Sequence, residues 1–447
     1  MLRPLGLLLL LAAAFQAATA AAQGGVDPKL KLALQRVTRS VSRKYNCSVS
    51  IGLRTSRGSV TAVGGIADFS TGRLATDTDS YAWGSVTKML TGASIMKLAS
   101  TGALSLDDEI GPLVDPILGA MAERDPAQNF SSVAGLWGAE AARTTVRQLL
   151  AMQSGIPDFD TANPNFTSGI SRDPLRAVLY SAPDHSDTPP QLMGVPWVAH
   201  KFRECEPFPG MNFSKFCYSS TNFMLLGLVL AANAGEISWR SFDQSTFLPP
   251  ALRGAIRFAN RGSPRSLNTV HGYDRTAYNM PKGEHNDHDN WEVNGVFAGW
   301  TASNLVATPA TVAELTWQIY GPPKSVAPKE FVDKMIPNAT SLYGLAAFNI
   351  GFQTGHAGSA LGVGYGHLGA TYGYQSVTGY FPALNIAISV ATNIETDNQV
   401  QPSDTLCLSY NAVASILLDT TYKCEFKAGG YYGGGCLCNQ TAPEIVV

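Results

Sequence analysis

Strand-like segments at both ends of the chain, separated by a long helical and irregular stretch, most constrain what this sequence can fold into. Alternating apolar and small or polar residues predict a hairpin within 46–68, with one strand at 48–53 and its return beginning at 60–63. Two more strands, 375–381 and 385–391, are predicted near the other end. Because strands must pair to satisfy their backbone groups, we expect the first and last segments to meet in one antiparallel sheet.

The residues between these strands predict helices and loops. An apolar run at 223–232 predicts a helix, and 145–150 predicts a short helix that ends in a turn rich in Gly and Pro. A closing helix is expected at 406–418, and a further strand at 343–352. The predicted fold is therefore α+β: an antiparallel sheet of five or more strands, flanked by helices and interrupted by a mostly helical insertion. The expected organisation is a signal peptide at 1–22, one domain at 23–420 (with an α/β part at about 26–105 and 298–420 and an insertion at about 106–297) and a Cys- and Gly-rich tail at 421–447.

The tetrad Ser85-Val86-Thr87-Lys88 carries the main chemical signal. Residues i and i+3 lie on one face of a helix, so the hydroxyl and the amine can meet. A desolvated lysine amine can lose its proton near neutral pH and accept one from serine, which activates the hydroxyl without a histidine base. Gly84 ends an extended segment, and Ser85 is expected to cap the helix that follows. That helix N-terminus would favour the negative charge that develops during attack.

A second tetrad, Ser94-Ile95-Met96-Lys97, competes for the same role. Ser94 lies nine residues further along the same predicted helix and therefore points to roughly the opposite side. We interpret Ser94 as a structural helix serine.

The beginning of the chain is typical of a secretory signal peptide, with Arg3 followed by an apolar run from Leu5 to Phe15 that is too short to span a bilayer. An N-terminal membrane anchor is the alternative interpretation.

Six N-x-S/T sequons and seven cysteines favour a secreted or lumenal, disulfide-bonded glycoprotein. The sequons are Asn46, Asn129, Asn165, Asn212, Asn338 and Asn439. Cys205 and Cys217 can close a short loop, whereas the pairing of Cys47, Cys407, Cys424, Cys436 and Cys438 stays open and leaves at least one thiol unpaired within the chain.

The overall charge gives no support for a strongly charged partner. The formal net charge is −2, with 32 basic and 34 acidic residues, which argues neither for nucleic acid nor for an acidic membrane surface, and we expect no nucleic acid partner. No later run is long and apolar enough to predict a membrane span. The cluster His285, Asp287, His288 and Asp289 sets no coordination geometry, so we expect a solvated loop there rather than a metal site.

The order of these segments resembles the serine β-lactamase and penicillin-binding-protein superfamily, most of all class C β-lactamases and their D-aminopeptidase, carboxypeptidase and esterase relatives, over about 46–418. The first motif is the tetrad at Ser85, and the family-like segment Gly102-Ala103-Leu104-Ser105-Leu106-Asp107-Asp108 follows it. The segment 145–150 and the turn Ser154-Gly155-Ile156-Pro157-Asp158 are similar to a helix and turn of the family. The second, Tyr-x-Asn in the family, falls at Tyr218-Ser219-Ser220, and the third, Lys-Thr-Gly or His-x-Gly, at His367-Leu368-Gly369.

The resemblance implies a role for each matching residue. Ser85 would be the nucleophile and Lys88 would hold or take its proton, while Tyr218 would share the acid–base work and relay a proton to the leaving group. His367 would lie on an edge strand and bind or polarise the substrate's carboxylate or carbonyl side. The backbone N–H groups of Ser85 and Ala370 would form the oxyanion hole, and Ser220 and Gly369 would contact the substrate. The mechanism requires no metal and no organic cofactor. A second His-x-Gly, at His356, is interpreted as a loop residue, and a merely buried aromatic is the alternative for Tyr218.

Two departures from the family pattern narrow the expected substrate. Ser220 replaces an Asn, so the side chain has a shorter reach, and His367 replaces a Lys, so the charge is weaker and depends on pH. Both changes favour a small-molecule or peptide-like ester or amide over a β-lactam. The resemblance therefore implies a secreted serine hydrolase that cleaves ester or amide bonds through an acyl-enzyme on Ser85. It would be an esterase, a D-aminopeptidase or carboxypeptidase, or a β-lactamase-like enzyme. The alternative is an inactive binding or scaffold protein of the same fold.

Overall fold

The computed structural model describes residues 25–160, 174–205, 215–276, 287–338, 341–397, 399–419 and 424. The signal peptide predicted at 1–22 and, apart from Cys424, the tail predicted at 421–447 lie outside the described residues. The same holds for the sequons at Asn165, Asn212 and Asn439, and for Cys436 and Cys438.

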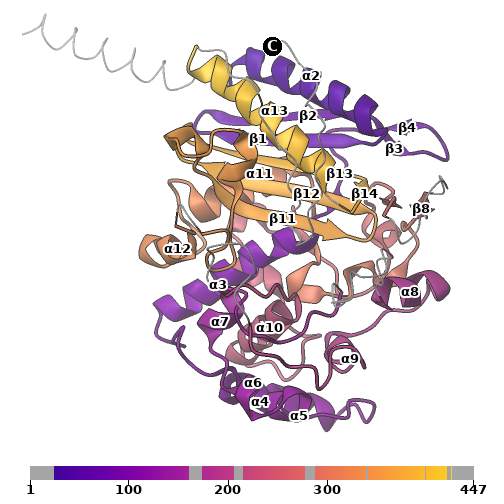
Figure 1. Cartoon of the computed structure of the whole chain (residues 1–447). Coiled ribbons are helices and arrows are strands. Elements are labelled where there is room, and N and C mark those ends of the chain that lie inside the picture. Colours follow the sequence, from indigo (N-terminus) through magenta and orange to yellow (C-terminus); the bar gives the residue numbers. More distant parts are fainter. Residues whose placement is uncertain are drawn as a thin grey trace, which may run out of the picture.

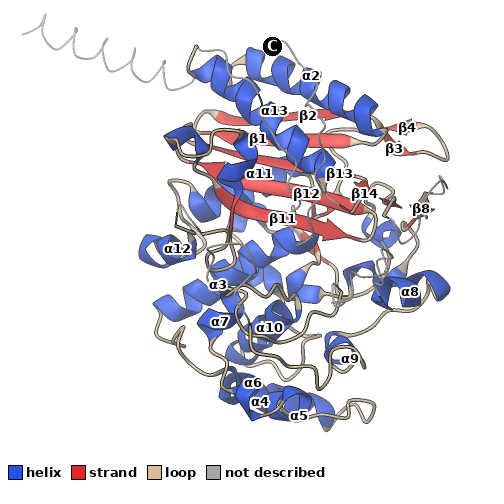
Figure 2. Cartoon of the chain, in the orientation of Figure 1, coloured by secondary structure: helices blue, strands red, loops and turns tan. Residues whose placement is uncertain are grey.

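A six-stranded antiparallel sheet in the order β10-β11-β12-β13-β1-β2 is the main sheet of the described residues (Figures 1 and 2). Its centre joins the two ends of the chain, because Val49 pairs with Thr392 and Thr55 with Ile386. The predicted α+β fold with a sheet of five or more strands is therefore confirmed. The strands are β1 (Val49–Thr55), β2 (Gly58–Gly64), β10 (Phe348–Asn349), β11 (Tyr365–Thr371), β12 (Tyr374–Phe381) and β13 (Ile386–Thr392).

Helices cover both faces of this sheet. Large side chains of β13, such as Ile388 and Val390, pack toward α2 (Pro28–Tyr45) and α13 (Val400–Leu417), which lie side by side on one face (Figure 1). The alternate residues Ala387 and Ala391 belong to the core on the other face, where α11 (Pro309–Tyr320) lies. Gly52 permits this close packing, because a Cβ there would lie 2.2 Å from the carbonyl oxygen of Pro309.

Most of the remaining helices form a layer below β11 in the view of Figure 1, with α3 next to the sheet and α7 and α10 beyond it. The apolar run at 223–232 is the buried centre of α10, as predicted. The predicted helix at 145–150 is α7, capped by Thr145 and Gln148 in a capping box. These helices are α3 (Thr87–Ser100), α4 (Ile110–Ala122), α5 (Val133–Trp137), α6 (Ala139–Ala142), α7 (Val146–Leu150), α8 (Pro174–Ser181), α9 (Pro189–Met193), α10 (Thr221–Asn233) and α12 (Lys329–Met335).

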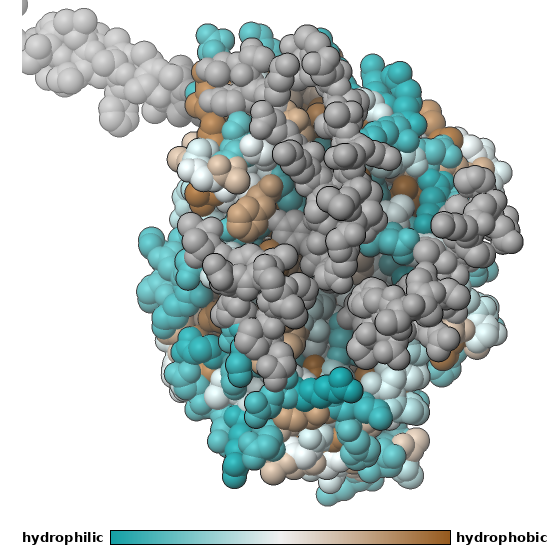
Figure 3. Space-filling view, in the orientation of Figure 1, coloured by the Kyte–Doolittle hydropathy of each residue, from teal (hydrophilic) through white to brown (hydrophobic). Residues whose placement is uncertain are grey.

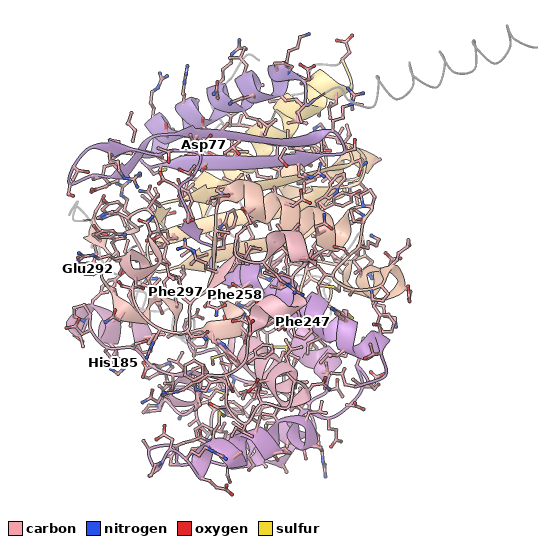
Figure 4. The ribbon with its side chains drawn as sticks, turned by 180° about the vertical axis from the view of Figure 1, so that it is seen from behind. Asp77, His185, Phe247, Phe258, Glu292 and Phe297 are labelled. Carbon is pink, nitrogen blue, oxygen red and sulfur yellow. A yellow bond between two sulfur atoms is a disulfide. The ribbon has the colours of Figure 1, made fainter. Side chains whose placement is uncertain are left out.

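Short strands and 3-10 turns make up the rest of the described secondary structure. Seen from behind, the labelled Phe258 and Phe297 lie below the main sheet (Figure 4). The short strands are β3 (Ile66–Asp68), β4 (Arg73–Leu74), β5 (Tyr81–Ala82), β6 (Arg257–Phe258), β7 (Tyr273–Asp274), β8 (His288–Asp289), β9 (Leu305–Ala307) and β14 (Ile394–Glu395). The 3-10 turns are η1 (Gly84–Val86), η3 (Gln244–Phe247), η4 (Pro250–Leu252), η5 (Pro264–Leu267), η6 (Asn294–Phe297), η7 (Trp300–Ala302), η8 (Ile350–Thr354) and η9 (Ala360–Gly362).

The strand predicted at 343–352 is mostly wrong. Only Phe348–Asn349 form a strand, and a 3-10 turn follows at once. The side chain of Asn349 accepts a hydrogen bond from the backbone N–H of Gly351, at 3.2 Å. This local bond offers the backbone an alternative to the sheet ladder and turns the chain away from β11.

Two disulfides are present among the described residues. Cys205 pairs with Cys217, as the spacing allowed, and Cys407 pairs with Cys424, while Cys47 is a buried free thiol. On the face drawn in Figure 3, the described surface mixes hydrophilic and hydrophobic residues. Within the part of the chain that the structure describes, no helix has the length and apolar character needed to cross a membrane.

Candidate active site

The start of α3 lies against strand β11, and two glycines make this contact possible. Gly84 has a positive φ of 52°, and a Cβ there would lie 2.4 Å from the carbonyl oxygen of Ala370. A Cβ on Gly369 would lie 2.1 Å from the carbonyl oxygen of Trp83. That same oxygen accepts a hydrogen bond from the hydroxyl of Ser376, at 3.0 Å. The backbones of η1 and β11 are therefore held side by side next to Ser85.

The hydroxyl of Ser85 is bonded on both sides. Its Oγ lies 2.9 Å from Lys88 Nζ and 2.8 Å from the phenolic oxygen of Tyr218. Ser85 lies inside η1 and makes no capping bond, so the expected helix cap is wrong: its hydroxyl is engaged by Lys88 and Tyr218 instead. The competing Ser94 is buried in α3 and donates its hydroxyl to the carbonyl oxygen of Leu90, as expected of a structural helix serine.

Lys88 is fully buried, and three acceptors surround its amine. Besides Ser85, these are Ser220 Oγ at 3.1 Å and the carbonyl oxygen of Ala302 at 3.1 Å. Burial lowers the pKa of Lys88 to about 8, although the carboxylates of Asp160 and Asp158 act in the opposite direction. A lysine in this environment is a competent general base near neutral pH.

Ser220 connects this amine to a buried carboxylate. Its hydroxyl binds Lys88, and its backbone N–H donates to Asp158 Oδ1 at 2.9 Å, just before α10 begins. Asp158 ends the Ser154–Asp158 turn, where the hydroxyl of Ser154 donates to Asn222 Oδ1 at 2.7 Å. The turn and the start of α10 therefore fix Ser220 together.

His367 lies on β11, which β10 pairs only at Tyr365 and Gly366, so the edge that β10 covers ends just before His367. The imidazole is fully buried, and both of its nitrogens are engaged. Nδ1 lies 2.5 Å from the carbonyl oxygen of Leu368, and Nε2 lies 3.0 Å from the hydroxyl of Tyr343. Burial and the charge of Lys88 lower the pKa of His367 to about 3, so the ring is neutral. The geometry does not favour the carboxylate-binding role expected from the sequence.

Sequence reasoning missed three aromatic residues beside the site, Phe216, Tyr343 and Phe348. These three contact one another, and Phe216 and Phe348 also contact the predicted Tyr218. Phe348 packs edge-on against His367 as well, with ring centroids 4.8 Å apart. The three residues lie outside the motifs, so only the packing of the chain brings them together. Ala302 was also missed, because it contributes only a backbone oxygen, which no sequence motif marks.

His356 and the group around His288 and Asp289 make their contacts outside the site at Ser85. His356 is in a loop, as predicted, and its Nε2 lies 2.7 Å from the side-chain oxygen of Asn411 in α13. The solvated loop expected around His288 and Asp289 is only partly correct. Asp287 and Asp289 are exposed, but His288 and Asp289 form the short strand β8, His288 stacks on Tyr180, and Asp289 binds His271. His285 lies outside the described residues. Among the described residues, no group of three or more ligand side chains is arranged to hold a metal ion.

Comparison with known proteins gives a family match and a set of structural neighbours. The family model described as Beta-lactamase matches residues 48–406. The protein flp of Staphylococcus aureus (strain MRSA252) is 26% identical over 202 residues, which are 45% of this chain and 32% of that protein. The chain therefore matches only about a third of the length of this curated relative.

Two solved structures illustrate the shared fold. The D-stereospecific amidohydrolase from Streptomyces sp. has a TM-score of 0.58 and 19% identity, covering 88% of this chain and 99% of its own. The D-amino acid amidase from Ochrobactrum anthropi SV3, complexed with L-phenylalanine, has a TM-score of 0.62 and 18% identity, covering 87% and 99%. At these sequence identities, the structural similarity shows that the fold is shared and shows nothing about activity.

Proposed function

Because this chain belongs to the beta-lactamase family and is a serine hydrolase of that type, we propose that it cleaves ester or amide bonds through an acyl-enzyme on Ser85. The observation that carries the proposal is the position of the Ser85 hydroxyl, 2.9 Å from the Lys88 amine and 2.8 Å from the Tyr218 phenol. A nucleophile within hydrogen-bond reach of two proton-transfer groups meets the geometric requirement for acyl transfer.

Acylation begins with attack of Ser85 Oγ on the substrate's carbonyl carbon. Neutral Lys88 takes the hydroxyl proton, and its pKa of about 8 provides a substantial neutral fraction at mildly alkaline pH. The carbonyl oxygen becomes an oxyanion, which the backbone N–H groups of Ser85 and Ala370 would stabilise. As the bond to the leaving group breaks, Tyr218 donates a proton to that group and is reprotonated from Lys88.

Deacylation repeats these steps with water as the nucleophile. Water attacks the ester carbonyl of acylated Ser85, its proton passes to the Lys88–Tyr218 pair, and the proton then returns to Ser85 Oγ as the acid leaves. Ser220, held by Asp158 and bonded to Lys88, would keep the amine aimed at Ser85 throughout.

The names of two structural neighbours support amides as one substrate class. Those proteins are described as a D-stereospecific amidohydrolase and a D-amino acid amidase. Together with Ser220 and His367 in place of the family's Asn and Lys, they favour small amides and esters over β-lactams as substrates of this chain.

We also propose that the protein is exported as a glycoprotein. The signal-peptide pattern, the six sequons and the two disulfides support this location. Expression in a secreting eukaryotic host, with analysis of the medium by peptide-N-glycosidase treatment and N-terminal sequencing, tests it. We expect cleavage near residue 22 and a loss of mass on deglycosylation, whereas retention of the first residues in a cell-bound product would contradict export.

A fluorophosphonate probe tests the catalytic proposal directly. We expect the full chain to be labelled stoichiometrically, with the label on the tryptic peptide that contains Ser85. Ser85→Ala should abolish labelling and Ser94→Ala should leave it intact, because Ser94 belongs to the packing of α3. A folded protein that resists the probe and all ester, amide and β-lactam substrates would instead be the binding or scaffold protein.

A further inference from the structure

His367 lies on the face of β11 that is turned toward the nucleophile. Side chains alternate along a strand, so His367 shares its face with Gly369, which contacts the backbone of Trp83. The charge on Lys88 lowers the pKa of His367, which is consistent with the two side chains lying within electrostatic reach. The group at this position therefore faces the site in which a substrate would react.

Hydrogen bonding fixes the tautomer of the His367 ring. A carbonyl oxygen only accepts, so Nδ1 must carry the hydrogen that it shares with Leu368, 2.5 Å away. In the neutral ring Nε2 is then an acceptor, and the hydroxyl of Tyr343 donates to it at 3.0 Å. Both nitrogens are used by the protein itself, and the ring carries no charge.

The surroundings of His367 keep it uncharged. The ring is fully buried, with Phe348 edge-on at 4.8 Å and the Tyr343 ring at 5.7 Å. Among the described residues, the charged group that acts on it is Lys88, whose positive charge opposes a second positive charge nearby. Protonation would have to overcome both effects.

Lys88 cannot take the place of a carboxylate anchor. A lysine ammonium has three N–H donors, and its three acceptors are Ser85, Ser220 and the carbonyl oxygen of Ala302. A substrate carboxylate next to β11 would therefore be desolvated beside aromatic side chains and a neutral imidazole. Desolvation of a charge without a compensating cation is energetically unfavourable.

We propose that Tyr343 holds His367 as an uncharged imidazole and so makes the enzyme selective for substrates that carry no carboxylate beside the scissile bond. This inference rests on the proposed acyl transfer at Ser85. Tyr343 acts through His367 and is therefore a positioning residue, while His367 determines specificity.

A matched pair of thioesters tests the selectivity. Phenylacetylthioglycolate and its carboxamide contain the same scissile bond and differ only in the carboxylate of the leaving group. After correction for their rates of alkaline hydrolysis, we expect kcat/KM of the wild-type protein to favour the carboxamide by ~10-fold or more. Equal values, a preference for the carboxylate, or turnover of neither thioester would overturn the selectivity. Fluorophosphonate labelling of Ser85, scored on the same sample, shows separately whether acyl transfer itself fails.

Two variants test how the selectivity arises. Tyr343→Phe removes the donor to Nε2, and we expect a smaller preference together with a changed 15N chemical shift of the His367 ring. Tyr365→Phe is the control, because its hydroxyl makes no hydrogen bond to another described residue of the protein, and it should keep the wild-type preference and ring shift. If Tyr343→Phe also keeps the wild-type preference and ring shift, Tyr343 has no positioning role.

His367→Lys tests the role of His367 itself and should move the preference toward the carboxylate by ~10-fold or more. A folded variant that is labelled at Ser85 but keeps the wild-type preference would contradict the role of His367.

Discussion

At the scale of single residues, the protonation of Lys88 is set by two opposing effects. Complete burial lowers its pKa to about 8, and the negative charges of Asp160 and Asp158 limit that fall. The active base is the neutral amine, so the acylation rate should rise with pH through the pKa of about 8 and level off above it. The carboxylates of Asp158 and Asp160 therefore help to set the pH range of activity.

Replacing Asp158 by Asn should move this profile toward lower pH. Asn keeps an oxygen for the N–H of Ser220, but it removes a negative charge that raises the pKa of Lys88. The rate of Ser85 labelling, measured against pH, should then rise at a lower pH than in the wild type. Asp107→Asn, at a surface ion pair with Arg147, is the matched control and should leave the profile in place. A shift toward higher pH would contradict the role assigned to Asp158.

The buried neutral His367 should make stability depend on pH. Its pKa is about 3 in the folded protein and about 6.5 in the unfolded chain. As pH falls below about 6.5, the unfolded state binds a proton that the folded state does not, so the free energy of unfolding decreases by at most ~1.4 kcal/mol per pH unit. His367→Asn should remove this decrease in urea titrations at pH 7, 6, 5 and 4. Parallel curves for the two proteins would show that His367 titrates normally.

At the scale of elements, the contact between η1 and β11 brings the nucleophile next to the proposed oxyanion donors. The contact depends on glycine at two points, because side chains at Gly84 and Gly369 would collide with backbone oxygens across it. Backbone atoms cannot rotate away as a flexible side chain can, so the two elements would have to separate.

Gly84→Ala should therefore lower kcat by ~100-fold or more, the effect of losing an oxyanion donor. Gly102→Ala is the matched control, since Gly102 also has a positive φ, of 74°, but has open space around it. The control carries the cost of the unusual backbone conformation, ~1 to 2 kcal/mol of stability, without the collision. The measurements are kcat and thermal unfolding. Equal activities of the two variants would mean that the contact does not position the donors.

At the scale of the whole molecule, a buried ion cluster ties α8 to the strands at one end of the main sheet. Arg176 of α8 binds Asp274 of β7 at 2.6 Å and Glu395 of β14 at 2.8 Å. Glu395 also accepts the N–H of Gly373, at 3.0 Å, in the turn that follows β11. One cation and two carboxylates thus join segments that are far apart in the sequence.

Arg176→Met should destabilise the protein by ~3 to 5 kcal/mol, because two buried carboxylates would lose their cation. Arg143→Met is the control, since the pair of Arg143 with Glu140 lies on the exposed surface, and we expect at most ~1 kcal/mol there. Urea unfolding of both variants gives the comparison. Similar losses in the two would show that the cluster contributes no more than a surface pair.

The sequence allowed local patterns to be predicted better than contacts between distant segments. The strands near 48–63 and 375–391 were predicted because alternation and turns are local, and Ser85, Lys88 and Tyr218 because motifs carry them. Tyr343 and Ala302 were not predicted, since their roles depend on how β11 and η7 pack around Lys88. Division of the chain into an α/β part and an insertion stays a prediction, as does the oxyanion role of Ala370.

The pairing of β1 with β13 also has a consequence for synthesis on the ribosome. Ser48 and its partner Asn393 are 345 residues apart, so at ordinary elongation rates about 20 to 70 s pass before the second reaches the first. During that time β1 and β2 can form only a hairpin with an open edge, and Ser85 lacks the strand that packs beside it. We expect ribosome-bound chains that stop before residue 365 to show no reaction with fluorophosphonate. The nascent protein would then have no hydrolase activity until most of the chain has been synthesised.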